Sequence, residues 1–442
     1  MVRGARLGTF VAIAAVVAGL SKVHAAWVAE PPYDYTGSFR FGWSILLVVV
    51  TAVIAYGLGL PDLPRTGRAA LAASATAGAL SAVALSVVQL VTGDALLPRF
   101  VVFATAAAVV PIGLVANAIV RRGTTRAGQR DRVLLVSSAG ESSTLEGDLA
   151  GPSVHPAVLV GHVDVGAASP PGSRALVESD AGATVVVLDR SAQAADHVVA
   201  QAAVLHERGI RVRTLSQFYE EWLGKLPVSE LERASLFFDI GELHRARYGR
   251  MKRVIDLVLG AVGLIPFAIA VPLVWLGNLA ANRGPLFYRQ DRVGRFDETF
   301  SIWKFRTMRP EPAGALVNEW TTEDDPRITP FGRVLRATHL DELPQVVNIL
   351  RGDLSVVGPR PEQPRYVEEL TEKLPFYGLR HLVRPGLTGW AQVMYGYAGD
   401  EADALQKLQY EFFYLRHQGV ALDLRIVGRT IRTVFGSQGG GR

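Results

Sequence analysis

Two adjacent carboxylates, Asp341 and Glu342, stand just before Pro344 in the stretch LDELPQVVNIL. Proline is tolerated in the first turn of a helix, so the pattern predicts a helix that begins at this pair and runs to about Leu350. A helix N-terminus favours anions, which keeps a carboxylate ionised and can also receive a phosphoryl group. Because neighbouring residues point about 100° apart on a helix, one carboxylate could attack phosphorus while the other holds a magnesium ion. The alternative is that both residues only cap the helix.

Basic side chains recur beside glycines and prolines around this pair. Guanidinium groups bind phosphate oxygens in a bidentate manner, and tight turns let the backbone approach the same oxygens. A predicted pair of strands over PLFYRQDRVGRFDETFSIWKFRTM presents Lys304 and Arg306 on its second strand. A solvated basic surface is the alternative for any single arginine. The recurring arginines are Arg327, Arg333, Arg336, Arg351, Arg360 and Arg384.

The composition of the 442-residue chain excludes several kinds of site. There is no cysteine, which excludes disulfides, thiolate nucleophiles, Cys-ligated zinc and iron–sulfur clusters. None of the nine histidines forms an HExxH or HxxxH pair, so a histidine metal site is not expected. The hydrophobic fraction of 49%, the mean hydropathy of +0.22 and the net charge of +5 favour a membrane surface or a phosphorylated substrate over nucleic acid.

Four apolar segments near the N-terminus have the length of about 20 residues that a helix needs to cross a bilayer. Lys22 and His24 interrupt the first, which could instead be a signal peptide. Basic residues gather before the first segment, between the second and third, and after the fourth. This distribution predicts that the N-terminus and everything after residue 121 are cytoplasmic. A soluble bundle of buried helices is the alternative. The segments are Leu7–Val28, Phe41–Leu60, Ala69–Val91 and Phe100–Val120.

The middle of the chain predicts a small, Rossmann-like α/β domain with a parallel sheet. RVLLV, VHPAVLVGHVDV, ATVVVLD and IRVRTL are typical of strands, and AQAADHVVAQAAVLHERG is typical of a helix closed by Gly209. No GxGxxG motif follows the first strand, where SSAGESS stands instead, so a dinucleotide site is not expected. A structural or regulatory role is the preferred interpretation of this domain.

A fifth apolar run, Leu257–Ala280, begins after Asp256 and contains Pro266 and Pro272. Each proline removes a backbone hydrogen bond and favours a kink. Both flanks are basic, which favours a bent helix that enters the cytoplasmic leaflet and returns. A complete fifth crossing is the alternative. Near the C-terminus, ALDLRIVGRTIRTVF is amphipathic and suits either a membrane surface or an ordinary core helix.

Five motifs follow one another in a fixed order: GPLFYRQDRVG, IWKFRTM, EDDPRITPFGRVLR, LDELPQVVNILRGDLSVVGPRPE and RPGLTGWAQV. Over Lys252–Phe435 the chain closely resembles the bacterial sugar transferases. These are the monotopic polyprenyl-phosphate phosphoglycosyl transferases that start exopolysaccharide, capsule, O-antigen and glycoprotein glycan assembly. The layout and the segment FYEEWLGKLP resemble the large members of that family.

The resemblance implies a ping-pong reaction at the bacterial inner membrane. Asp341 would attack the sugar-side phosphate of a nucleoside diphosphate sugar, usually a uridine diphosphate hexose, and undecaprenyl phosphate would then take the phosphosugar. Glu342 would bind Mg²⁺, and the family also has a re-entrant helix. The residues expected to bind substrate are Lys304, Arg306, Arg327, Arg336, Arg360 and Arg384. A homo-oligomer is a further expectation, and nucleic acid is not expected as a partner.

Two departures from the family pattern lie outside the carboxylate pair. The helix-breaking Ser-Pro is absent, so the residue that bends the helix is left open between Pro266 and Pro272. A Tyr-Asp pair common near the C-terminus reads Tyr410-Glu411 here, which preserves the charge.

The predicted domains are a transmembrane domain at residues 1–124, a cytoplasmic domain at 131–225 and a catalytic domain at 250–442 with a re-entrant helix at 254–281. An inactive membrane scaffold of a polysaccharide assembly complex is the first functional alternative, and the intact Asp341–Glu342 pair argues against it. A transporter is the second. It is disfavoured because none of the four N-terminal segments carries an acidic residue or an arginine near its middle.

Overall fold

The computed structural model of the chain describes residues 2–60, 67–92, 96–124, 130–138, 140–170, 173–179, 182–227, 242–281, 284–309, 327–374, 376–395 and 401–435. Contacts between Cα atoms divide it into two compact units. The first contains residues 1–129 and 421–435, and the second contains residues 130–420 and 436–442. Arg126, which contributed to the charge pattern, and the long loop before Arg327 lie outside the described residues.

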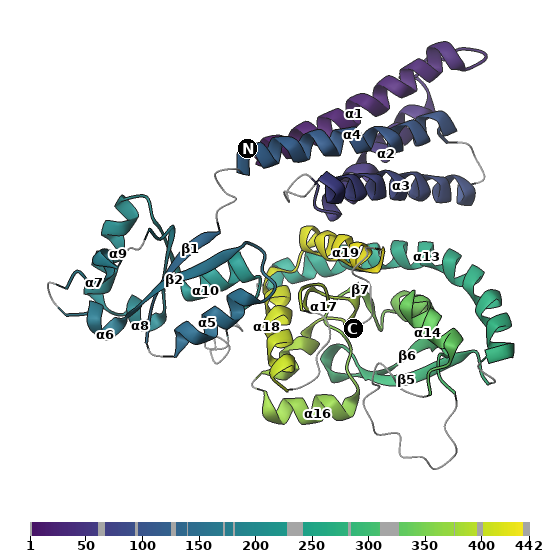
Figure 1. Cartoon of the computed structure of the whole chain (residues 1–442). Helices are drawn as coiled ribbons and strands as arrows, with labels where there is room; N and C mark the ends of the chain where they lie inside the picture. The colour runs from purple at the N-terminus through teal and green to yellow at the C-terminus, as the bar shows by residue number, and fades with distance from the viewer. Residues whose placement is uncertain are drawn as a thin grey trace. The chain divides into compact units, whose positions relative to one another are not determined.

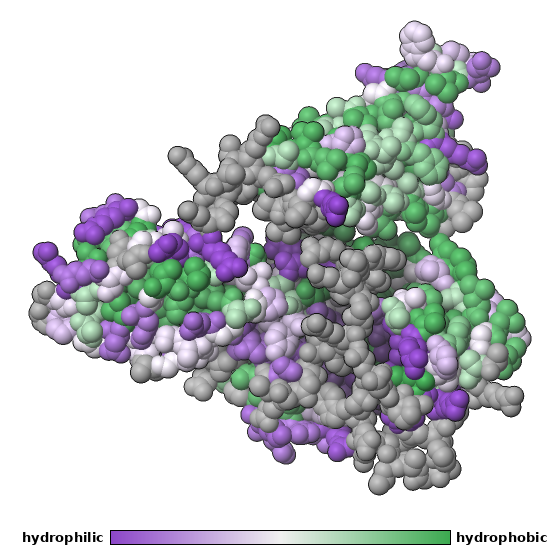
Figure 2. All heavy atoms as spheres, in the orientation of Figure 1, coloured by the Kyte–Doolittle hydropathy of each residue, from purple (hydrophilic) through white to green (hydrophobic). Residues whose placement is uncertain are grey.

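The first unit is helical and strongly apolar (Figures 1 and 2). Neighbouring helices surround a core that includes Ile13, Leu47, Leu85 and Val101. Small residues let the helices pack closely: a Cβ on Gly78 would lie 2.3 Å from a carbonyl oxygen of α4. The elements are α1 (Val2–Val23), η1 (His24–Val28), α2 (Phe39–Gly57), α3 (Gly67–Thr92), α4 (Arg99–Thr124) and α19 (Val420–Phe435).

Five helices among the described residues are long and apolar enough to cross a membrane. Several of them lie in the N-terminal part of the chain, and Tyr248–Leu279 contains the interrupted run. Their apolar stretches are Leu7–Val28, Phe39–Gly57, Ala70–Gln89, Arg99–Val120 and Tyr248–Leu279.

The second unit begins with the middle domain (residues 131–227), whose four-stranded sheet is parallel and has the order β2-β1-β3-β4. The parallel sheet predicted from the β-branched runs is therefore present, and Gly209 follows α9 with a φ of 89°. The strands are β1 (Asp131–Ser137), β2 (Ala157–Asp164), β3 (Val185–Leu188) and β4 (Arg211–Thr214), and the helices are α5 (Glu141–Ala150), α6 (Val165–Ala168), α7 (Ala175–Glu178), α8 (Arg190–Gln193), α9 (Asp196–Glu207), α10 (Leu215–Phe218) and η2 (Tyr219–Leu223).

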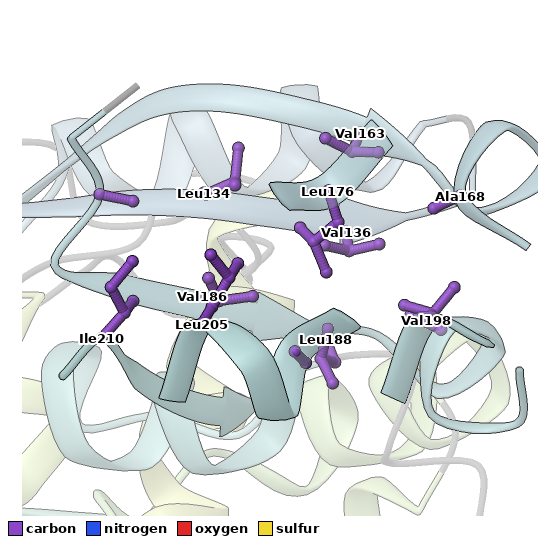
Figure 3. Close-up of a cluster of buried hydrophobic side chains, with 13 residues drawn as sticks. Leu134, Val136, Val163, Ala168, Leu176, Val186, Leu188, Val198, Leu205 and Ile210 are labelled. Carbon is purple, nitrogen blue, oxygen red and sulfur yellow. The ribbon is translucent and has the colours of Figure 1, made fainter. Parts of the chain in front are cut away.

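Each face of this sheet is covered by helices because alternate strand residues point to opposite sides. Leu134, Val136 and Val186 pack against Leu205 and Val198 of α9 on one face (Figure 3). On the other face, residues of β1 and β3 pack against α5, α10 and η2. The middle domain is therefore a three-layer arrangement with an apolar core on each side of the sheet.

The C-terminal domain (residues 242–417) has short strands and many loops. Its sheets are the antiparallel pair β5–β6 and the parallel pair β7–β8. The two strands predicted around a turn at the start of this domain are confirmed as β5 and β6. The elements are α13 (Glu242–Ala281), β5 (Phe287–Val293), η3 (Arg295–Asp297), β6 (Thr299–Phe305), α14 (Pro330–Ala337), η4 (Leu340–Gln345), α15 (Val346–Arg351), β7 (Ser355–Val357), α16 (Pro364–Lys373), η5 (Tyr377–Leu382), β8 (Gly386–Thr388), α17 (Trp390–Met394) and α18 (Glu401–His417).

The segment FYEEWLGKLP joins the middle domain to the C-terminal domain. Lys225 is buried, forms an ion pair of 2.6 Å with Asp148 and donates a hydrogen bond of 2.7 Å to Gln406 of α18. The Trp390 indole donates to the Gly224 carbonyl at 2.7 Å. Leu226 is part of an apolar cluster with residues of α18 and η5. The two domains therefore share buried polar and apolar contacts.

Candidate active site

The carboxylate pair lies in η4, a 3₁₀ helix that runs directly into α15. The predicted helix is present over this range, but its first six residues are 3₁₀ rather than α. Pro344 lies inside that stretch, and the Glu342 amide donates to the His339 carbonyl three residues earlier. A 3₁₀ helix has three residues per turn, so Asp341 and Glu342 point about 120° apart.

The two carboxylates have different surroundings. Glu342 Oε1 accepts a hydrogen bond of 2.8 Å from Lys304 Nζ and lies 3.7 Å from an Arg360 nitrogen. Asp341 is only 8% exposed, yet its carboxylate makes no hydrogen bond or ion pair with any residue that the structure describes. A buried carboxylate without a partner is costly. Asp341 is therefore the group in this site that is free to react.

The surroundings shift the pKa values of the two carboxyl groups in opposite directions. Burial raises the pKa of Asp341 above its ordinary value; Glu342 acts in the same direction, while Lys304 and Arg336 oppose the rise. Burial would also raise the pKa of Glu342, but Lys304 and Arg360 outweigh it and hold that pKa at about 2. Glu342 therefore loses its proton more readily than Asp341, and Asp341 is the carboxyl of the pair that takes up a proton first as the pH falls.

Lys304 is positioned by β6. Its strand neighbour Phe305 is buried and packs against Phe287 of β5, with the two rings stacked 5.5 Å apart. Because strand residues alternate, the anchoring of Phe305 directs Lys304 to the opposite face. Asn348 of α15 is fully buried and accepts from the Trp303 amide, which ties the helix that follows the carboxylates to the same strand.

Arg336 reaches the pair from α14. Thr329 caps this helix by accepting from the Gly332 amide at 2.9 Å, and Pro330 occupies the first turn. A Cβ on Gly332 would lie 1.9 Å from the Thr307 carbonyl, so only glycine permits this close approach. Arg336 then donates to Thr307 Oγ1 at 3.1 Å.

Arg360 is held by a buried network. Arg380 donates to the Arg360 carbonyl at 2.8 Å and forms a bidentate pair with Glu411 of α18 at 2.6 and 2.8 Å. The loop before Arg360 approaches β8 so closely that a Cβ on Gly358 would lie 2.4 Å from the Arg384 carbonyl. This packing brings the VVGPRPE and RPGLTG motifs together.

The structure brings Lys304, Arg336 and Arg360 together around Asp341 and Glu342. Arg306 donates to the Pro285 carbonyl, and Arg384 donates to the Gly352 carbonyl at the far end of α15. The Arg327 carbonyl accepts a hydrogen bond from the Arg309 amide. Arg351 stacks on Trp303, with 5.3 Å between its guanidinium carbon and the ring centre. Substrate binding by Arg306, Arg327 and Arg384 stays a prediction.

Sequence reasoning did not identify Arg380 or His339 as parts of the site. The Tyr410-Glu411 departure was the one available signal for Arg380, because a charged residue at a buried helix position requires a partner. His339 has a φ of 56°, and its position next to the carboxylates follows from the turn between α14 and η4.

The donor set of the site suits a hard cation. No group of three or more Asp, Glu or His residues that could hold a metal is present in the described part of the chain. Magnesium is usually bound by one or two carboxylates together with substrate phosphates and water. Glu342 can meet that requirement together with substrate phosphates, since Oε1 is the oxygen of its carboxylate that contacts Lys304 and Arg360.

Comparisons with known proteins agree with this geometry. Residues 247–437 match the family described as "Bacterial sugar transferase". The chain is 35% identical over 243 residues to the UDP-N-acetylgalactosamine-undecaprenyl-phosphate N-acetylgalactosaminephosphotransferase of Aeromonas hydrophila, covering 54% of this chain and 55% of that protein. It is 39% identical over 197 residues to the UDP-glucose:undecaprenyl-phosphate glucose-1-phosphate transferase of Caulobacter vibrioides, covering 44% and 73%.

A third relative consists almost entirely of the matched region. An uncharacterised sugar transferase of Bacillus subtilis is 37% identical over 198 residues, which are 43% of this chain and 89% of that protein. In contrast, this chain matches only about half the length of the Aeromonas relative. Because the chain matches the family over residues 247–437 and covers most of the Caulobacter and Bacillus relatives, it belongs to the bacterial sugar transferase family.

Proposed function

We propose that this protein transfers a sugar 1-phosphate from a uridine diphosphate sugar to undecaprenyl phosphate, with Asp341 as the nucleophile. The observation that carries the proposal is the unpaired, buried carboxylate of Asp341 beside Lys304 and Arg336. Names of relatives that act on UDP-glucose and UDP-N-acetylgalactosamine support a uridine diphosphate donor. The sugar itself stays open.

The reaction has two displacements at phosphorus. An Asp341 oxygen attacks the sugar-side phosphorus, the bond to the bridging oxygen breaks, and uridine monophosphate leaves with that oxygen. A phosphate oxygen of undecaprenyl phosphate then attacks the same phosphorus and releases the Asp341 carboxylate. The product is a polyprenyl diphosphate sugar, and the enzyme returns to its starting state.

The cations around the pair suit this chemistry. Lys304, Arg336 and Arg360 can stabilise charge on the phosphate oxygens as each bond breaks. Glu342 would hold Mg²⁺, and its Oε1 accepts a hydrogen bond from Lys304. The ion, when bound, would neutralise the diphosphate and favour departure of the nucleotide.

Contacts at both ends of its apolar stretch support a re-entrant course for α13, which Figure 1 shows as a bent helix. Near the start, Asp256 accepts from Ser355 Oγ and the Val356 amide, both at 3.0 Å. Near the end, Val274 packs against residues of β6 and α14, and a Cβ on Gly277 would lie 2.3 Å from the Phe331 ring.

A straight helix would separate these two contact sites by roughly 30 Å, about the thickness of the hydrocarbon core. Because both sites contact the same C-terminal domain, a return to the same side of the membrane fits better than a crossing. Pro266 and Pro272 lie inside the helix and supply two positions for a bend.

The charge pattern of the N-terminal helices supports an active site on the cytoplasmic side, and the inner membrane of a bacterium is the expected location. The Rossmann-like interpretation of the middle domain stays part of this proposal, as do a supporting role for that domain and a homo-oligomeric state.

The function is tested by release of uridine monophosphate from purified membranes that contain the full chain, Mg²⁺, undecaprenyl phosphate and a panel of UDP-sugars. We expect release with one donor, loss of at least 10³-fold in Asp341→Asn, and loss on chelation. Asp291→Asn, which changes an exposed aspartate of β5, is the matched control and should retain activity. No release with any donor from folded protein would contradict the proposal.

A further inference from the structure

Three arginines gather at the C-terminal end of α15, at the opposite end of the helical segment from the carboxylate pair. Arg253 of α13 donates to the Ile349 and Leu350 carbonyls at 2.6 and 2.7 Å. Arg384 donates through Nε to the Gly352 carbonyl at 2.9 Å. Arg295 donates to the carbonyl of Leu382, two residues before Arg384. We call Arg253, Arg295 and Arg384 the α15 arginine cluster.

Helix capping explains only part of this cluster. The last carbonyls of a helix attract basic side chains, and Arg253 satisfies two of them. Arg384 uses one of its three nitrogens in this way. Its two terminal nitrogens make no hydrogen bond or ion pair with any residue that the structure describes. The cluster therefore has donors beyond those that α15 requires.

One carboxylate, that of Asp256, acts on Arg384 beside the two other arginines of the cluster. Burial, together with Arg295 and Arg253, lowers the pKa of the Arg384 guanidinium, and Asp256 alone among the acidic residues opposes that effect. Asp256 is buried and accepts two hydrogen bonds through Oδ1 from Ser355 and Val356, while its Oδ2 has no hydrogen-bond partner among the described residues. An anion with several oxygens would complement the remaining charge.

The cluster lies at the base of an exposed apolar helix face. Residues of α13 next to Arg253 and Asp256 are strongly exposed: Val254 is 61% exposed and Val258 is 57% exposed. Apolar side chains continue along the outer face of this helix (Figure 2). An apolar face bordered by arginines is typical of a segment at the level of lipid headgroups, with side chains in the acyl region and charges among the phosphates.

The distance from the carboxylate pair argues against a part in the displacement itself. Gly352 lies eleven positions after Asp341, and the chain between them is first in 3₁₀ and then in α conformation. The rise per residue of these helices gives roughly 20 Å between the two ends. A phosphate at the cluster is therefore out of reach of Asp341, which disfavours the reacting lipid as its occupant.

We propose that the α15 arginine cluster binds the phosphate headgroup of an anionic bilayer phospholipid and thereby holds the first arm of α13 at a fixed depth in the membrane. The contact is separate from the transfer reaction. It does not depend on the function proposed above.

Native mass spectrometry of the full-length protein, released from detergent with added phosphatidylglycerol, tests this proposal. We expect retained phosphatidylglycerol and about fivefold lower occupancy in Arg295→Gln, since one basic residue near an anionic surface contributes about 1 kcal/mol. Arg295 is exposed, so its replacement leaves the fold intact; Arg384→Gln should reduce occupancy further. Arg289→Gln is the matched control, because Arg289 is an exposed arginine of β5 that stacks on the Trp303 ring, as Arg295 of η3 does on the Phe296 ring. It should bind lipid as the unaltered protein does.

Two competitors identify the occupant. Inorganic phosphate at millimolar concentration should displace little phosphatidylglycerol; full displacement would indicate a site for free anions and overturn the proposal. Retention of undecaprenyl phosphate in place of phosphatidylglycerol at this site would overturn it as well, as would equal phosphatidylglycerol occupancy in all variants. Asp341→Asn should retain the phospholipid, so a failure of the proposed reaction leaves this result unaffected.

Discussion

The middle domain and the C-terminal domain are stabilised in different ways. The middle domain has an apolar core on each face of a regular parallel sheet, with Leu134, Val186 and Leu205 fully buried. The C-terminal domain depends on buried polar groups: Asn348 is 0% exposed, and Arg380 and Glu411 are 4% and 5% exposed. In the middle domain, apolar side chains are buried on both faces of a regular sheet. In the C-terminal domain, an irregular backbone with buried charged groups holds several cationic side chains around the carboxylate of Asp341.

Among the substitutions considered, we expect the largest loss of stability when Glu411 is replaced. Glu411→Gln leaves the buried guanidinium of Arg380 without its counter-charge, which costs about 3–5 kcal/mol. We expect a lower thermal midpoint for the detergent-purified protein and, because Arg380 supports the Arg360 backbone, a fall in transferase activity at temperatures where the variant is folded. Thermal unfolding and uridine monophosphate release measure the two effects.

Leu205→Ala tests how a loss of stability in the middle domain affects transferase activity. Removing this side chain from an apolar core costs about 2–5 kcal/mol. The loss should be confined to the middle domain, visible as faster hydrogen exchange in β1, β3 and α9. Transferase activity should stay within about twofold below the unfolding transition, since Leu205 does not contact the C-terminal domain. An activity loss as large as that of Glu411→Gln would remove the distinction between the two domains.

The sequence predicts the regular elements of the middle domain better than the buried polar pairs of the C-terminal domain, because sequence patterns report mainly on neighbouring residues. The β-branched runs predict β1 and β3, and the closing glycine predicts the end of α9, because these elements depend on neighbouring residues. The motifs around Asp341 predict the chemistry and, through the family resemblance, its residues. The pairing of Arg380 with Glu411 joins residues 31 positions apart, and no local pattern reports it.

The same limit explains the placement of Arg384. Its motif resembles the family's, and it was expected to bind substrate, but its neighbours Arg253 and Arg295 come from distant parts of the chain. The strands β7 and β8 have three residues each, too few for a periodic signal. The 3₁₀ geometry of η4 is likewise a small departure that hydrophobic periodicity does not resolve.

Lys304→Met sharpens the account of the site through its pH dependence. Lys304 lowers the pKa of Asp341 and of Glu342, so its removal should raise both. The ionised form of Asp341 is the reactive one, so activity is present above its pKa and is lost as the pH falls through it. We expect the acid limb of kcat/KM to move to higher pH. An unchanged acid limb with folded protein would show that Lys304 does not act on the carboxylates.

The smallest effect is expected at Lys373. Its ion pair with Glu369 on α16 is 3.0 Å long and exposed. Such pairs contribute about 0.3–0.5 kcal/mol. Lys373→Met should therefore change the thermal midpoint and the acid limb by no more than experimental error, which makes it the control for both Glu411→Gln and Lys304→Met.

The central claim is that Asp341 carries the phosphosugar between two half-reactions. The most direct measurement is mass spectrometry of the peptide containing Asp341 after the enzyme is exposed to its UDP-sugar donor without undecaprenyl phosphate. We predict a mass increase of one sugar phosphate on Asp341, its absence in Asp341→Asn, and its disappearance when undecaprenyl phosphate is added. Release of uridine monophosphate only when both substrates are present, with no modified peptide, would contradict the account.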